Sequence, residues 1–397
     1  MALSAGAASS QNYAVNEQDQ SGDVTAEQDL SVTDVTDETV AVTTATANSY
    51  DAYVEDGDLD IDSRQSASGT VGAMSYMEVN GASGAQTVTA TAATGNAADG
   101  GLYAGILNAR VRQQTSGPSI AATSYIDAGT AETGYLSSNT QAIANSQGFG
   151  MEHGAGTMEV EQSNSSIVSA YGGADYNYVD DQAVVTASAA ANNVTSNAIG
   201  DSTQTIAVTQ ENTGPVTEAR TQTYYDNVYL ATTQSTASGN NVSIENETGP
   251  LAAAANQTND SVIVASAESG AYDFGGATTI AYGVANSMVA GNYGEGIVID
   301  STQFNGTDGD VDTYASFEGG YGYDASVSAT SIGNASTGFA CSDCQSTMDV
   351  NNRQENQANI HAASQMSIGG SGRTISGTAT AVGNTASYYV TRPQTGG

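Results

Sequence analysis

Residues 158–164 read MEVEQSN, and this short stretch contains the pattern that decides the fold. Met158, Val160 and Gln162 share one parity, whereas the two residues between them are glutamates. Because successive side chains of a β-strand point to opposite faces, the stretch predicts a strand with a charged outer face and an apolar inner face that ends in an amide. A buried amide without partners costs about 1–3 kcal/mol, so this glutamine needs a regular hydrogen-bond partner.

The same glutamine recurs through the chain and marks a repeat. It stands at Gln18, Gln65, Gln113, Gln162, Gln210, Gln257, Gln303 and Gln354. An asparagine series with the same period, often preceded by Thr-Ala residues and a glycine, lies at Asn48, Asn96, Asn145, Asn193, Asn240, Asn286, Asn334 and Asn384. Two independent markers with one spacing predict about eight repeats of about 48 residues, which form a single repeat domain over residues 11–397.

Stacked repeats give each inward glutamine a partner, because amides of neighbouring copies can pair in a ladder. The sequence therefore predicts an all-β fold, a repetitive β-solenoid similar to a parallel β-helix. The alternative is a row of β-sandwiches of about 96 residues each, which the scarcity of large aromatic core residues disfavours. Each repeat could contain two coils of about 24 residues or three of about 16, and eight repeats would then form a rod of roughly 75 to 115 Å.

Composition supports a β-rich, exported protein. The 397 residues include 45 Gly, 4 Pro, 21 Tyr and no Trp. The charge of −36 comes from 43 acidic and 7 basic residues, which argues against nucleic acid or an anionic membrane as a partner. Residues 1–10 contain the small-x-small pattern Ala5-Gly6-Ala7, so we expect them to be the remnant of a signal peptide.

Two groups of residues are candidates for special chemistry. Cys341 and Cys344 form a Cys-x-x-Cys motif, which in an oxidising compartment predicts a local disulfide and in a reducing one a redox or zinc site. Alternating aspartates could bind calcium, although a solvated acidic edge explains the same pattern. These aspartates are Asp56, Asp58, Asp60, Asp308, Asp310 and Asp312. No nucleophile elbow or phosphate loop is present, so we predict no enzymatic activity and no cofactor other than calcium as a candidate ion.

The Thr-Ala-x-Ala-x-Gly-Asn and Gln-x-Asn-x-Gly/Ser repeats of this acidic chain resemble those of the holdfast attachment (anchor) protein D family of stalked alphaproteobacteria. They also resemble curlin subunits more distantly. The first resemblance implies a cell-surface, outer-membrane-associated protein that works with other anchor proteins to fasten an adhesive polysaccharide, the holdfast, to the cell. Self-association of the chain is a further expectation.

Tyrosines are the expected sugar-stacking residues of such an anchor, although they could instead cover the corners of the solenoid. The candidates are Tyr135, Tyr178, Tyr225, Tyr272 and Tyr323, together with their neighbours Tyr125, Tyr176, Tyr224, Tyr229 and Tyr321. Two competing functions are a β-helical polysaccharide-degrading enzyme, which would need a unique cleft with acid and base groups, and an amyloid-like matrix subunit.

Overall fold

A computed structural model describes residues 11–341, 347–370 and 372–391, which fold into 18 parallel strands with no helix among them. The strands are β1 (Gln11–Gln20), β2 (Val24–Val35), β3 (Glu38–Val54), β4 (Asp58–Ala67), β5 (Val71–Ser83), β6 (Gln86–Thr115), β7 (Ser119–Thr133), β8 (Tyr135–Asn164), β9 (Ile167–Ile199), β10 (Thr203–Asn212), β11 (Val216–Asn246), β12 (Leu251–Asn259), β13 (Val262–Asn292), β14 (Ile297–Asn305), β15 (Val311–Cys341), β16 (Met348–Asn356), β17 (Ile360–Gly370) and β18 (Thr374–Thr391). The predicted all-β solenoid is confirmed.

Each repeat forms a single coil. Strand β1 pairs with β4 so that Gln11 lies beside Asp58, and β4 pairs with β6 so that Leu59 lies beside Leu107. The chain therefore returns to the same place only after a whole repeat. The prediction of two or three coils per repeat is wrong, because strands such as β9, with 33 residues, continue round the molecule where short strands and turns were expected. Eight coils at about 4.8 Å each make a stack of roughly 40 Å.

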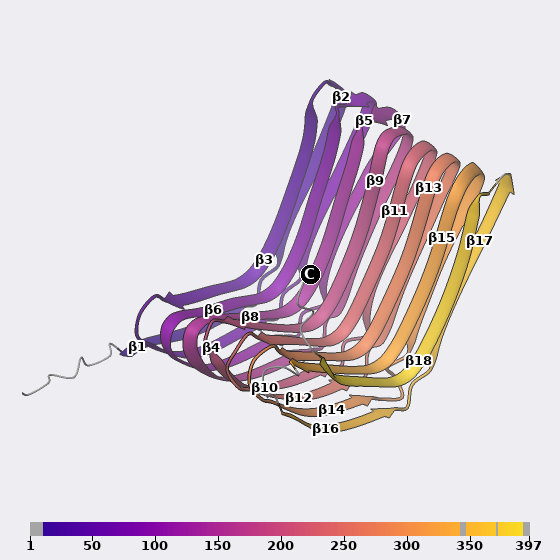
Figure 1. The fold of residues 1–397 in the computed structure, drawn as a ribbon. Coiled ribbons are helices and arrows are strands. Elements are labelled where there is room, and N and C mark those ends of the chain that lie inside the picture. The colour runs from indigo at the N-terminus through magenta and orange to yellow at the C-terminus, as the bar shows by residue number, and fades with distance from the viewer. Residues whose placement is uncertain (1–10, 342–346, 371, 392–397) are drawn as a thin grey trace, which may run out of the picture.

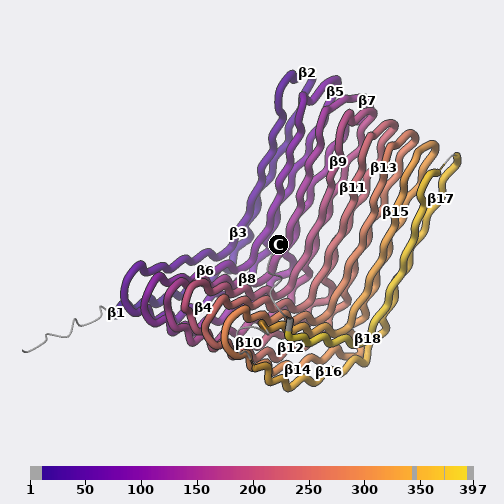
Figure 2. Tube along the Cα trace, in the orientation of Figure 1, coloured from indigo at the N-terminus to yellow at the C-terminus, as the bar shows by residue number. Residues whose placement is uncertain are grey.

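The coil is bent into an L (Figure 1). In each coil the segment that stacks in register with β3 runs along the inner side of both arms, and the segments that stack with β1 or β2 line the outer side. Long strands such as β6 and β9 contribute to both sides. Figure 2 shows the same bend in every coil. We call the arm that contains β2 the long arm and the arm that contains β1 the short arm. Each arm is a two-layered sandwich with its own core, around residues such as Ile126 and Leu136 in the long arm and Leu107 and Met158 in the short arm.

The bend lies at the asparagine marker of each repeat. The register between neighbouring coils is interrupted at the preceding residue, for example at Ala47 beside Gly95. That residue is alanine or glycine in all eight coils: Ala47, Gly95, Ala144, Ala191, Gly239, Ala285, Gly333 and Gly383. A small side chain at this position lets the strand turn from one arm into the other without crowding the corner.

Candidate functional site

The glutamine series forms a continuous ladder at the corner of the L. Each amide nitrogen donates to the glutamine oxygen of the preceding coil, from Gln65 to Gln18 through to Gln354 to Gln303, at 2.7 to 2.9 Å. The same nitrogen also donates to a backbone carbonyl of the opposite layer, as Gln210 does to Asn241 at 3.0 Å. The ladder therefore holds neighbouring coils together and closes the two layers on each other.

A second ladder runs along the asparagine series in the opposite sense, since Asn48 donates to Asn96 and Asn334 donates to Asn384. In the fourth coil the member is Asn192, which pairs with Asn145 and Asn240, so the assignment of Asn193 to this series is wrong by one position. Two adjacent asparagines cannot be distinguished by spacing alone. Asn193 instead faces outward and bonds Asn241.

A third ladder, of the polar residues two positions after each glutamine, was not predicted from the sequence. It connects Thr115, Asn164, Asn212, Asn259, Asn305 and Asn356. Members such as Asn164 also donate to a carbonyl two residues later, so they form the turn and the ladder together. All three ladders are occupied by the fold itself, and ligand contact has to be sought elsewhere.

The two acidic runs lie at separate places and are already bonded. Asp60 accepts hydrogen bonds from Asn108 and Gln11, which lower the pKa of its carboxyl. Asp310 accepts from the backbone and side chain of Asn359 on the next coil. No group of three or more His, Cys, Asp or Glu side chains is arranged to hold a metal in the described part of the chain. Calcium binding is left as a prediction without a supporting geometry.

Cys341 is buried at the end of β15. Its predicted partner Cys344 lies outside the described residues, so the local disulfide stays a prediction.

The candidate tyrosines separate into buried and exposed groups. Tyr225 and Tyr176 are fully buried in the long arm, and burial raises the pKa of both phenols, so neither can stack on a ligand. For Tyr225 the prediction of a binding role is wrong, because its side chain points inward in the alternation of β11. Tyr135 is half-buried at the long-arm tip. The exposed candidates are Tyr178, Tyr224, Tyr229, Tyr272, Tyr321 and Tyr323.

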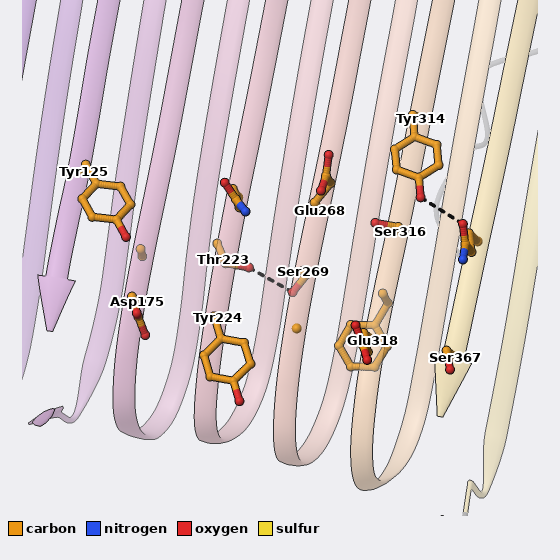
Figure 3. Close-up of a pocket in the computed structure, with 15 residues that line it drawn as sticks. Tyr125, Asp175, Thr223, Tyr224, Glu268, Ser269, Tyr314, Ser316, Glu318 and Ser367 are labelled. Atoms are coloured by element: carbon orange, nitrogen blue, oxygen red, sulfur yellow. Dashed lines mark hydrogen bonds between the residues drawn. The ribbon is translucent and has the colours of Figure 1, made fainter. Parts of the chain in front are cut away.

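A groove of about 500 Å³ opens on the outer face of the long arm, across β7 to β17 (Figure 3). Tyr125, Tyr224 and Tyr314 lie along it, with Glu268 and Glu318 between them. The other lining side chains include Asp175, Gln222, Ser316, Gln365 and Ser367. We call this the outer groove. It extends across several coils because it is built from columns of in-register side chains.

Glycines shape the outer groove. A β-carbon at Gly270 would lie 3.0 Å from the ring of Tyr224, and one at Gly173 would lie 2.4 Å from the ring of Tyr125. Each ring therefore lies over the glycine of the next coil. Tyr125 also stacks on Tyr76 with ring centroids 6.3 Å apart. The tyrosines thus cover the sheet and present a flat apolar surface at once.

The groove is electronegative. Burial and the nearby Asp127 and Asp226 raise the pKa of Asp175 above the usual carboxyl range. Burial of the ring and, to a smaller extent, the negative charge of Asp226 raise the pKa of the Tyr224 phenol. None of the residues that line the groove is basic. Carboxylates and phenols beside flat rings can accept hydrogen bonds from sugar hydroxyls while the rings cover an apolar sugar face.

Sequence reasoning missed Asp175, Glu268 and Glu318 as site residues. The signal was available in the repeat alignment, since Asp127, Asp175 and Glu318 occupy one column with Tyr224. A second groove of about 520 Å³, the tip groove, contains Tyr178, Tyr229, Tyr321 and Tyr323. These rings lie at the end of the long arm, and all four belong to the tyrosines that the sequence suggested as candidates.

The family model described as holdfast attachment protein D matches residues 33–310, which covers most of the coils and the strands up to β14, whereas the parts of both grooves on β15 and β17 lie beyond it. The chain belongs to the holdfast attachment protein D family. Its role is therefore in holdfast attachment, at the surface of the cell. No curated protein and no solved structure matches the chain. Within the described residues, no helix is long and apolar enough to cross a membrane.

Proposed function

We propose that this member of the holdfast attachment protein D family is a non-enzymatic anchor that binds the adhesive polysaccharide directly and fastens it to the cell envelope. The observation that carries the proposal is the outer groove, where exposed tyrosines and carboxylates from successive coils form one open surface. The proposal includes export of the chain, association with the outer membrane, and contact with other anchor proteins there.

The groove suits many weak contacts better than one strong contact. Its volume of about 500 Å³ lies in the range of ligand sites, but it is shallow and runs across coils, as a polymer requires. Contacts repeated along one polymer raise avidity by orders of magnitude without a deep pocket. The rigid sheet beneath holds the tyrosines in fixed positions, so little conformational entropy is lost when the polymer binds.

The test replaces the chromosomal gene with a double variant, Tyr125→Ala and Tyr224→Ala, whose side chains lie in the outer groove. Tyr13→Ala is the matched control, because Tyr13 is 69% exposed on the short arm and lies outside this groove. We expect the double variant to be made and folded normally, and its cells to secrete adhesive polysaccharide but shed it into the medium. Tyr13→Ala cells should retain it.

Purified protein completes the test. We expect the wild-type chain to bind holdfast polysaccharide in a pull-down and the double variant to bind several-fold less. Cells of the double variant that retain their holdfast would contradict the groove as the binding site. Release of reducing ends from the polysaccharide by purified wild-type protein would contradict the non-enzymatic function and favour a polysaccharide-degrading enzyme instead.

A further inference from the structure

Four columns of outward side chains on the inner face of the long arm carry no charge. Strands β3, β6, β8, β9, β11, β13, β15 and β18 stack there, and on β11 the outward positions are Thr232, Gln234, Thr236 and Ser238. All residues in register with these four, through the eight coils, are Ser, Thr, Asn, Gln, Ala, Val, Ile or Tyr. Four columns of side chains therefore form a continuous neutral surface in a chain of net charge −36.

The opposite face of the same arm is different. On β11 its outward positions are Glu218, Arg220, Gln222 and Tyr224, and every one of these four columns contains carboxylates in one coil or another. Both sets of positions point away from the core, so packing does not explain the difference. Charged side chains on outward strand positions suppress unwanted association, and the four columns of the inner face have none.

A groove lies on this neutral face near the long-arm tip. It has a volume of about 760 Å³ and runs across β9 to β18. Thr232, Thr278 and Ser326, which occupy one column in successive coils, line it with their hydroxyls. The rings of Tyr229 and Tyr323 also line it; both are more than half exposed. We call this the inner groove.

The hydroxyls of the inner groove form a regular series. Neighbouring coils repeat about every 4.8 Å along the stack, so the part of the column from Thr232 to Ser376 offers a hydroxyl at each step, whereas β9 carries Val184 at this position. A hydroxyl both donates and accepts hydrogen bonds, and the tyrosine rings supply flat apolar surface. Repeated hydroxyls beside aromatic rings are the groups that recognise a polyhydroxylated chain. A single charged pair, Arg373 with Asp324, lies at the C-terminal end of the groove.

Charge decides the occupant. A polyanion is repelled by the whole molecule, and a polycation is attracted to the carboxylates of the outer face. A second copy of the chain that entered the inner angle of the L with its outer face would bury carboxylates without partners at a large cost. An uncharged polymer has neither obstacle.

We infer that the inner face of the long arm is a second polysaccharide-binding surface, specific for uncharged sugar units, which start in the inner groove and continue over the four neutral columns. This inference rests on the proposed function and adds to it. The two faces of one arm would then hold different chemical parts of the adhesive: neutral segments inside the L, and segments that need carboxylates on the outside.

The test measures binding of the full chain to purified holdfast polysaccharide at low salt and at about 0.5 M salt, where exposed charge pairs are screened. The variant is Thr232→Val with Thr278→Val, which removes two hydroxyls but keeps the shape and the β-propensity. Thr232→Ser with Thr278→Ser is the matched control because it keeps both hydroxyls. Tyr224→Ala reports on the outer groove alone.

We expect wild-type binding to retain a component that survives high salt. The valine variant removes two hydrogen bonds per site, so the affinity of the salt-resistant component should fall roughly tenfold. The serine control and Tyr224→Ala should retain this component. Two results would overturn the inner-face inference: a valine variant that binds like wild type at high salt, or wild-type binding that high salt abolishes. In either case the proposed function would stand if Tyr224→Ala weakens binding at low salt. No binding by wild type under either condition would overturn both.

Discussion

Replacing Gln210 with leucine tests how far the amide ladder carries the fold. Gln210 is buried, donates to Gln162 and to the carbonyl of Asn241, and accepts from Gln257 at 2.8 Å. Leucine fits the volume but leaves the oxygens of Gln162 and Asn241 without this donor. Each buried polar group left unpaired costs about 1–3 kcal/mol, so we expect a loss of about 3–5 kcal/mol in the free energy of unfolding.

The matched control is Gln354→Leu in the last coil. Gln354 makes the same two donations, to Gln303 and to Thr385, but among the described residues no later coil donates to it, and water reaches its surroundings. We expect a loss of about 1 kcal/mol there. Denaturant unfolding followed by circular dichroism measures the free energy of unfolding of both variants. Because a repeat stack can unfold in parts, the first unfolding transitions of the two variants are compared. Equal losses in the two variants would refute the reasoning that the ladder derives its strength from being buried and continued on both sides.

Three further predictions follow from the same geometry. Gly117→Ala should lower the unfolding free energy by about 1–3 kcal/mol, because the new β-carbon would lie 2.1 Å from the carbonyl oxygen of Gly69, whereas Gly150→Ala, with no atom within 4 Å, should be nearly neutral in the same melt. Asp175 has a raised pKa in the folded chain, so its ionised form destabilises the fold; stability should rise as pH falls from neutral through that pKa, and Asp175→Asn should remove this rise in melting temperature measured against pH. A chelator should leave the melting temperature unchanged, and a shift of several degrees on adding calcium would contradict that expectation.

The strand faces around the glutamine could be predicted because polar and apolar residues alternate there. Around Met158 and Val160 one face is buried and the other charged, so parity shows both the strand and its inner side. The ladder follows from that parity together with the spacing. Predicting the outer groove also requires the register between coils, because its residues come from different columns that lie side by side only in the stacked repeats.

The coil could not be predicted because its long strands carry no turn signal at the bend. The sequence around Ala90 and Ala379 also has no clear phase: Ala90 faces outward in register with Thr378, whereas Ala379 faces the core side. Both faces of these strands are built from small, uncharged residues, so hydrophobicity does not alternate with side-chain direction. The missing alternation that hid the winding is the same feature that makes the inner face neutral.

The single-coil repeat has a mechanical consequence. Each coil adds about 4.8 Å to the stack but contains about 48 residues, which span roughly 160 Å when fully extended. Since every coil pairs only with its neighbours, a pull on one end can peel off one coil and leave the remaining seven intact. A cell tethered through this protein would gain slack about thirty times the height of the coil it loses, so a sudden load would be absorbed as added length before any bond to the surface breaks.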